Sequence, residues 1–147
     1  MSSIAIGDIH GNFLALDNLL DYLAPYIRAE DTIVFLGDYI DRGPDSKKCI
    51  DRILSLRSYY HERVVTLLGN HEQWMMRTYE DHASHSWLFG MEAFNTIRSY
   101  SPDAERRLQN EAAKEALRPI TDGVPLPYKI FFEAVPREHI EFFFGGV

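Results

Sequence analysis

The feature that most constrains this fold is an alternation of apolar runs and amphipathic stretches over the first 72 residues. Short apolar runs at 3–6, 32–36 and 63–68 each predict a buried β-strand. Residues 12–24 and 46–59 repeat apolar side chains every three or four positions, which predicts one helix between successive strands. This order is typical of a parallel sheet with right-handed crossovers. The sequence therefore predicts an α/β fold with a βαβαβ core.

After this alternation the pattern becomes helical. Helices are expected over 72–79, 86–100, 102–117 and 136–143. The apolar stretch 128–134 is compatible with either a strand or a helix. We therefore interpret residues 1–147 as a single domain, with a strand-bearing half at 1–72 and a helical cap region at 73–147.

Composition narrows the class of protein. With 147 residues, 46% hydrophobic and 25% charged, the chain resembles an ordinary soluble globular domain. No apolar run is long enough to span a bilayer, and the N-terminus lacks the features of a signal peptide. Because Cys49 is the only cysteine, no internal disulfide can form, and we expect a cytoplasmic location. The net charge of −7 argues against nucleic acid as a partner and is compatible with bound cations.

Three polar loops follow the three predicted strands. The first loop is GDIHG at 7–11, the second is GDYIDRGP at 37–44, and the third is GNHE at 69–72. Ligands of open parallel sheets bind at the carboxyl ends of the strands. We therefore expect the polar side chains of these loops to converge on one site.

Four of these side chains suit a metal ion. Asp8 and His10 alternate around Ile9, so both can point to the same side of an extended segment. An oxygen and a nitrogen ligand together suit zinc, iron or manganese better than calcium. Asp38 has two carboxylate oxygens that can bridge two cations, and Asn70 offers an amide oxygen.

Three other side chains suit phosphate chemistry. The planar guanidinium of Arg42 matches the geometry of a phosphate group. A carboxylate such as Asp41 beside His71 would orient the imidazole and favour its protonated form, which prepares a general acid. Each motif alone is common in turns and surface ion pairs. All three motifs in order, each closing a predicted strand, favour a joint metal and phosphate site.

These motifs resemble those of the calcineurin-like metallophosphoesterase superfamily, and within it the phosphoprotein phosphatase family. Leu68 stands where eukaryotic members usually place arginine, which points to the bacterial type. The stretches 87–100 and 136–143 also resemble bacterial serine/threonine phosphatases. The resemblance implies a four-layer αββα sandwich, of which the βαβαβ unit would be the N-terminal part.

The resemblance also implies a cofactor and a reaction. Two divalent metal ions are expected, with manganese first and iron or zinc as alternatives. It implies that Asp8 and His10 bind the first metal, that Asp38 bridges both, and that Asn70 binds the second. A hydroxide activated by the dinuclear centre would then hydrolyse phosphate monoesters.

The remaining roles concern the substrate. The resemblance implies that His71 protonates the leaving oxygen, that Asp41 holds His71, and that Arg42 binds the phosphoryl oxygens. The expected substrates are a phosphorylated protein or peptide, or a small phosphoester. A symmetrical dinucleoside tetraphosphatase is the alternative, because it uses the same loops.

The chain departs from the family at its end. Members continue with a His-Ala-Gly and a Gly-His-Thr segment, each supplying a metal-binding histidine, whereas this sequence ends at Val147. We therefore expect a C-terminally truncated member with an uncovered apolar sheet face, through which the chain could self-associate. A catalytically defective remnant is the corresponding alternative function.

Overall fold

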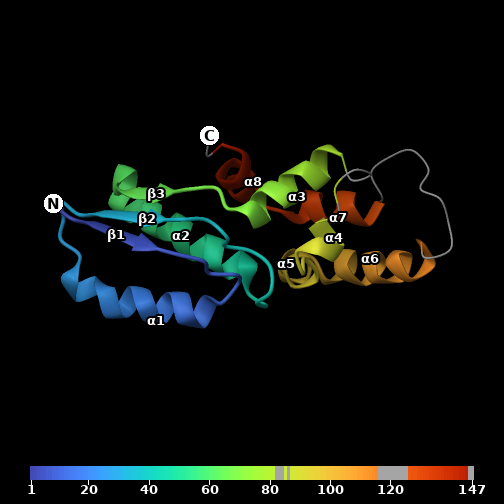
Figure 1. The fold of residues 1–147 in the computed structure, drawn as a ribbon, viewed down its shortest axis with the longest axis horizontal. Helices are drawn as coiled ribbons and strands as arrows, with labels where there is room; N and C mark the ends of the chain where they lie inside the picture. The colour runs from blue at the N-terminus through green and yellow to red at the C-terminus, as the bar shows by residue number, and fades with distance from the viewer. Residues whose placement is uncertain (82–84, 86, 116–125, 146–147) are drawn as a thin grey trace.

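A computed structural model describes residues 1–81, 85, 87–115 and 126–145 (Figure 1). Three strands form one parallel sheet in the order β1-β2-β3, and they span Ser3–Ile6, Thr32–Phe35 and Val64–Thr66. Ile33 of β2 lies opposite Ile4 of β1 and Val64 of β3. Helices α1 (Phe13–Leu23) and α2 (Ser46–Tyr60) connect the strands. The predicted α/β fold with a parallel βαβαβ core is therefore confirmed.

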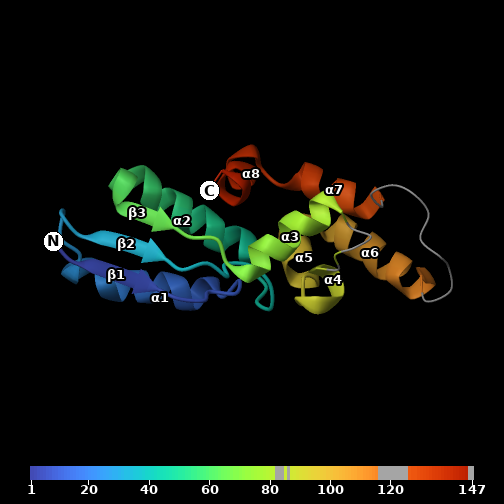
Figure 2. The same ribbon diagram turned by 45° about the horizontal axis from the view of Figure 1, so that its top comes forward.

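Both connecting helices cover the same face of the sheet, because the two crossovers step across it in the same direction (Figures 1 and 2). The side chain of Asn12 caps α1 by accepting a hydrogen bond from the backbone of Ala15. Leu16 and Leu20 of α1 and the β2 residues Ile33 and Phe35 are buried in this layer. Short 3₁₀ helices follow α1 at Ala24–Tyr26 and α2 at His61–Arg63.

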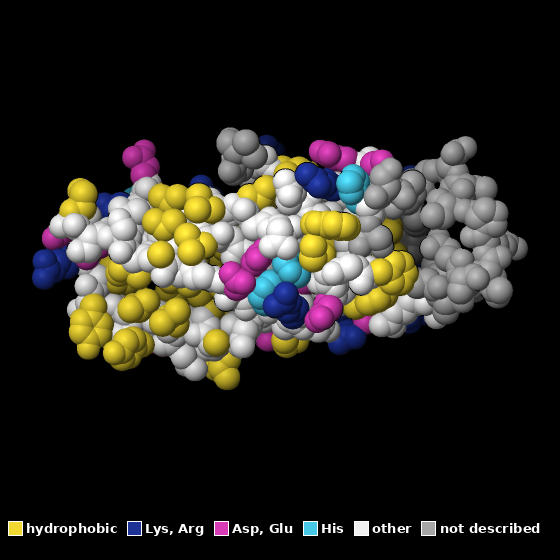
Figure 3. Space-filling model, in the orientation of Figure 1, with side chains coloured by type: hydrophobic (Ala, Val, Ile, Leu, Met, Phe, Trp, Pro, Cys, Tyr) yellow, Lys and Arg dark blue, Asp and Glu magenta, His cyan; other side chains and the backbone are white. Residues whose placement is uncertain are grey.

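The opposite face of the sheet is open among the described residues. Leu36, Val65 and Leu67 are exposed on it by 49%, 37% and 47%, and hydrophobic side chains gather over the sheet in Figure 3. The strands are thus buried on their helix side only, and β3 is shorter than the predicted 63–68. An uncovered apolar face was expected; self-association through it stays a prediction.

The rest of the described chain is helical. Its helices are α3 (Asn70–Glu80), α4 (Trp87–Gly90), α5 (Phe94–Tyr100), α6 (Pro102–Glu115), α7 (Leu126–Ala134) and α8 (Arg137–Phe144). The prediction of a single helix over 86–100 is wrong, since a turn around Glu92, whose φ is 57°, separates α4 from α5. The ambiguous stretch 128–134 is helical. Residues 116–117, predicted to end α6, and residue 86 lie outside the described part.

These helices extend the molecule beyond the carboxyl ends of the strands (Figure 1). Their core is aromatic: Phe131 of α7 lies 5.5 Å from the ring of Trp87 in α4 and 5.9 Å from that of Tyr100 in α5. In α8, Phe142 contacts the ring of Tyr39 from the second loop. None of the described helices is both long enough and apolar enough to cross a membrane.

Candidate metal and phosphate site

The first and second loops pack against each other at the carboxyl ends of β1 and β2. The backbone N–H groups of Ile9 and His10 both donate to the carbonyl of Asp38, at 3.0 and 2.9 Å. The third loop lies as close to the second: a Cβ on Gly37, whose φ is 105°, would stand 2.4 Å from the nitrogen of Gly69. Glycine at this position therefore permits the backbone contact that gathers the loops.

Three of the predicted ligands form a compact cluster. The ligand atoms of Asp8, His10 and Asp38 all lie within 4.8 Å of one another. The Nδ1 atom of His10 lies 3.0 Å from the carbonyl oxygen of Ile40, so this nitrogen carries the proton and donates it there. The lone pair of His10 is thereby left on Nε2, which lies 3.6 Å from a carboxylate oxygen of Asp8.

Asn70 adds a fourth group to this cluster. It is the first residue of α3, and its amide lies 2.9 and 3.1 Å from the two carboxylate oxygens of Asp38. An amide nitrogen turned toward the carboxylate would donate to both of its oxygens. A cation held by Asp38 would favour the amide oxygen in that place.

These four side chains fit divalent metal ions by their donor chemistry. Carboxylate, imidazole and amide donors together suit transition metals such as manganese, iron or zinc. Among the described histidines, His10 and His71 lie at this cluster. His61 follows α2, and His85 lies edge-on to Trp74. His139 is buried in α8, so none of these three completes the ligand set.

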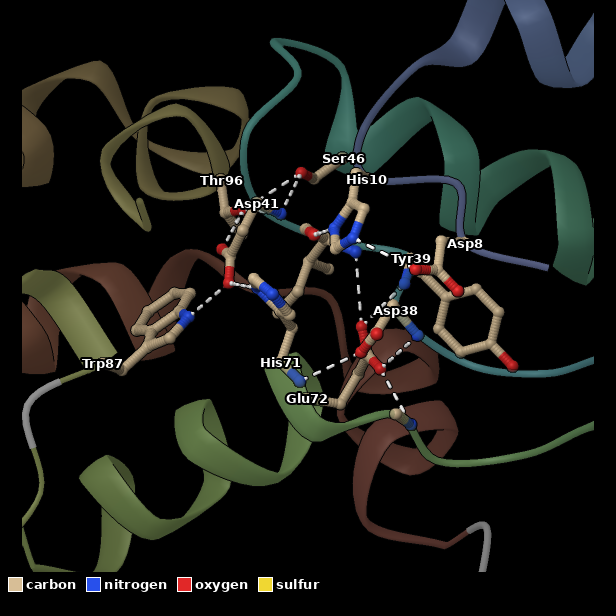
Figure 4. A network of polar contacts seen from close by, with 12 residues as sticks. Asp8, His10, Asp38, Tyr39, Asp41, Ser46, His71, Glu72, Trp87 and Thr96 are labelled. Carbon is tan, nitrogen blue, oxygen red and sulfur yellow. Dashed lines mark hydrogen bonds and ion pairs between the residues drawn. The ribbon is translucent and has the colours of Figure 1, made fainter. Parts of the chain in front are cut away.

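His71 and Asp41 form the predicted carboxylate–imidazole pair (Figure 4). His71 Nδ1 lies 2.8 Å from Asp41 Oδ2, and both side chains are buried. The hydrogen bond to Asp41 raises the pKa of His71 above its ordinary value, although burial opposes this. The ring of His71 stands 4.6 Å from that of His10, so the acid candidate adjoins the metal candidate.

Arg42 follows Asp41 on an exposed turn. Its backbone carbonyl accepts a hydrogen bond from Asn95 of α5 at 2.6 Å. None of the ion pairs found among the described residues involves the guanidinium of Arg42. The positive charge of Arg42 is near enough to His71 to oppose the rise in the pKa of His71. Arg42 is thus placed to offer its guanidinium to an anion.

Four site residues hold a left-handed backbone: φ is 47° at His10, 54° at Asp38, 72° at Asp41 and 62° at Arg42. Residues other than glycine adopt such angles at a cost of order 1–3 kcal/mol each, and these conformations concentrate at functional sites. Hydrogen bonds between the loops, such as the one from Gly43 N to the carbonyl of His10 at 2.9 Å, hold this backbone in place.

Glu72 is a site residue to which the sequence analysis assigned no role. Its buried carboxylate accepts hydrogen bonds from four backbone N–H groups, those of Asp38, Tyr39, Ile40 and Gly69, at 2.8–3.2 Å. Burial raises the pKa of Glu72, and these hydrogen bonds oppose the rise. Its position three residues after Gly69, the N-cap of α3, is that of the glutamate in a capping box, and it accepts the backbone N–H of the N-cap as such a glutamate does.

Trp87 and Thr96 were also missed. Trp87 Nε1 donates to Asp41 Oδ2 at 2.7 Å, and the Thr96 hydroxyl donates to Asp41 Oδ1 at 2.7 Å. Both residues belong to the stretch 87–100, whose resemblance to bacterial serine/threonine phosphatases assigned no role to any single residue. The structure therefore brings together the seven predicted side chains, and it adds three buried residues that hold them.

A family profile described as calcineurin-like phosphoesterase matches residues 1–136. A zinc-dependent endopolyphosphatase of Saccharomyces cerevisiae is 30% identical over 112 residues, which are 73% of this chain and 33% of that protein. A putative serine/threonine-protein phosphatase of Caenorhabditis elegans is 37% identical over 67 residues, or 46% of this chain and 18% of that protein. A symmetrical bis(5'-nucleosyl)-tetraphosphatase of Aeromonas salmonicida is 42% identical over 72 residues, or 49% and 24%. The chain thus spans a third or less of the length of each of these relatives.

Proposed function

The chain belongs to the calcineurin-like phosphoesterase family, and from this premise we propose that it is a metal-dependent phosphoesterase. The observation that supports this most directly is the cluster of Asp8, His10 and Asp38 beside the His71–Asp41 pair. A metal cluster alone would serve a structural site. A buried acid–base pair next to a metal cluster is an arrangement that favours metal-assisted hydrolysis over a structural role.

Four side chains would hold the metal ions. We assign Asp8 and His10 to a first divalent cation, Asp38 to a bridging position, and Asn70 to a second cation. When bound, such cations lower the pKa of bound water to about 7 and neutralise charge on a phosphoryl group. Manganese is the proposed metal, and zinc gains support from the zinc-dependent relative; iron is a third candidate.

The residues of the second and third loops would act on the ester. Asp41 holds the Nδ1 proton of His71, so the Nε2 atom of the imidazolium is left to donate a proton to the leaving oxygen. The exposed guanidinium of Arg42 would bind the phosphoryl oxygens in a bidentate manner. Binding, charge neutralisation and proton donation are thus divided among different side chains.

For the substrate class we propose phosphoserine and phosphothreonine in proteins or peptides. An exposed Arg42 is compatible with a large substrate approaching from outside, and the similarity to the putative serine/threonine-protein phosphatase supports the class. A symmetrical dinucleoside tetraphosphatase is the second candidate, favoured by 42% identity to a relative of that name.

The test strips the purified chain of metal, restores manganese, zinc or iron separately, and measures hydrolysis. The substrates are a phosphothreonine peptide, diadenosine tetraphosphate and inorganic polyphosphate. The proposal expects metal-dependent release of phosphate from the peptide, and abolition of this release by Asp38→Asn. Asp17→Asn is the matched control, since Asp17 is paired with Arg52 on the helix layer.

Each other outcome has a meaning. Preferred cleavage of diadenosine tetraphosphate or of polyphosphate would replace the protein-phosphatase assignment and keep the family chemistry. If the chain binds no metal and cleaves none of the three substrates, it is catalytically defective and the proposal is wrong.

A further inference from the structure

The carboxylate of Asp41 is completely buried and is bound at both of its oxygens by side chains (Figure 4). Oδ2 accepts from Trp87 Nε1 at 2.7 Å and lies 2.8 Å from His71 Nδ1. Oδ1 accepts from the Thr96 hydroxyl at 2.7 Å. Trp87 and Thr96 come from α4 and α5, which supply none of the proposed metal ligands.

We infer that Trp87 and Thr96 are positioning residues for proton donation by His71. They fix the rotation of the Asp41 carboxylate, and the fixed carboxylate aims His71 Nε2 at the leaving oxygen. This inference rests on the proposed function, because it assigns a purpose to contacts of the same site. It extends that function by locating control of the general acid in helices outside the three motif loops.

The two donors are themselves held firmly. Trp87 is fully buried, its ring packs against Phe131, and its backbone N–H donates to the hydroxyl of Thr78 at 3.1 Å. A rigid indole therefore points its single N–H at Asp41.

Thr96 is equally constrained. Its hydroxyl accepts from the backbone N–H of Asp41 at 2.7 Å and lies 3.0 Å from the hydroxyl of Ser46. Because it bonds to both the backbone and the side chain of Asp41, it fixes the carboxylate relative to its own main chain.

Geometry explains why one partner would be insufficient. A carboxylate bound only by an imidazole can rotate about its Cβ–Cγ bond, and the imidazole then loses its orientation. Donors on both oxygens stop this rotation. Misalignment of a catalytic group by about 1 Å can cost about 10²-fold in rate.

The test uses variants that remove one hydrogen bond with little change in shape. Trp87→Phe keeps an aromatic ring and removes the indole N–H, Thr96→Val removes the hydroxyl, and Thr96→Ser restores it. Trp74→Phe is the matched control, because Trp74 contacts His85 and not Asp41. Each variant is assayed with an alkyl phosphate, whose leaving group needs a proton, and with p-nitrophenyl phosphate, whose leaving group does not.

We expect Trp87→Phe and Thr96→Val to lower kcat on the alkyl phosphate about tenfold to a hundredfold, the range for a hydrogen bond to a charged group. kcat on p-nitrophenyl phosphate, and KM for both esters, should change by less than about threefold. Thr96→Ser should recover most of the loss, and Trp74→Phe should resemble the unmodified chain.

A second readout needs no catalysis. In metal-free protein labelled with ¹⁵N, the indole N–H signal of Trp87 should lie downfield of that of Trp74 and should shift when Asp41 becomes asparagine. If the chemical shift of the Trp87 indole N–H does not change in Asp41→Asn, the geometric basis of the inference is wrong.

The outcomes separate this inference from the proposed function. If the unmodified chain hydrolyses neither ester, the proposed function fails and the inference fails with it. If it hydrolyses both, and Trp87→Phe and Thr96→Val slow both equally, only the inference fails. If both variants lose thermal stability but keep their kcat on the alkyl phosphate, the inference also fails. The contacts of Trp87 and Thr96 with Asp41 would then only attach α4 and α5 to the rest of the fold.

Discussion

Residues 1–72 supply every side chain that we assign to metal, phosphate or proton, whereas described residues after 72 supply contacts that hold Asp41. The first segment presents its chemistry on three loops at one end of a sheet. The second packs an aromatic core and sends Trp87 and Thr96 onto Asp41. Identity and orientation of the reacting groups are therefore supplied by different parts of the chain.

The two segments also differ in which groups form their polar contacts. In residues 1–72, backbone groups of one loop bond to those of the next, and Glu72 gathers four of them. In the described residues after 72, side chains of the helices make polar contacts with the first segment, such as those from Trp87 and Thr96 to Asp41. The comparison predicts that substitutions in the first segment change what the site binds. Substitutions in the second segment should change how well Asp41 and His71 are oriented for proton donation.

Asp38→Asn should produce the largest effect and tests the first half of the comparison. Loss of a bridging charge weakens both proposed metal positions, so we expect turnover to fall more than about 10³-fold and bound metal to fall with it. Metal analysis by mass spectrometry beside the hydrolysis assay checks this. Full activity with unchanged metal content would show that the chemistry lies elsewhere.

His71→Asn should produce the second largest effect. It tests whether metal binding and proton donation depend on different side chains of the first segment. A general acid contributes about 10²–10⁴-fold to the rate, and we expect a loss of that size on an alkyl phosphate. Metal content should stay nearly constant, since the ring of His71 is bonded to Asp41 and His71 is not one of the proposed metal ligands. The role of general acid is wrong if turnover of the alkyl ester survives within a factor of a few.

Glu72→Gln should lower stability and so tests whether the loops depend on this side chain. An amide cannot accept at both ends, so some of the four backbone donors lose their partner, at about 3 kcal/mol in total. Urea unfolding of the metal-free protein measures the change. The matched control is Glu80→Gln at the exposed end of α3, which should stay within about 0.5 kcal/mol.

The smallest effect is expected at His139, where the second segment contacts α2. Its ring is fully buried, with Nε2 2.8 Å from Asp51 and Nδ1 2.7 Å from the hydroxyl of Tyr100. Burial lowers the pKa of His139 below 6.5, although Asp51 opposes this. Among the other nearby charges, Lys47 favours the neutral ring and Glu138 the charged one.

A lowered pKa means that the unfolded chain binds the proton more readily than the folded one. The stabilising contribution of neutral His139 is therefore complete above pH 6.5 and is lost as the pH falls through the folded pKa. His139→Gln should remove this part of the pH dependence in urea unfolding between pH 7 and about 5. His61→Asn, at an exposed position, should leave it unchanged; equal pH profiles for wild type and His139→Gln would contradict the assignment.

The motif loops could be predicted because their signals are local. Strand, turn and polar residue follow one another within a few positions, and parallel topology then brings Asp8, Asp38 and Asn70 to one edge. The contacts that aim the site could not be predicted in this way. They join Asp41 to residues 46 and 55 positions away. The stabilising contact between His139 and Asp51 spans 88 positions and was missed for the same reason.

The same reasoning explains the errors in the helices. Periodicity marks an amphipathic face, and it continued through the turn at Glu92 because α4 and α5 bury residues of similar spacing. A positive φ at glutamate leaves no signal in apolar spacing. The third strand was predicted too long for a related reason, since Leu67 and Leu68 are apolar but lie exposed after β3.

The left-handed backbone of the second loop creates a conflict between stability and turnover at Arg42. Aspartate and histidine tolerate a positive φ comparatively well, so Asp38, Asp41 and His10 are suited to their turns. Arg42 has no such tolerance, and asparagine there would relax the chain by about 1 kcal/mol while removing the guanidinium. Selection of variants for thermal resistance alone would therefore favour replacement of Arg42. Directed evolution of this chain should select first for phosphate release.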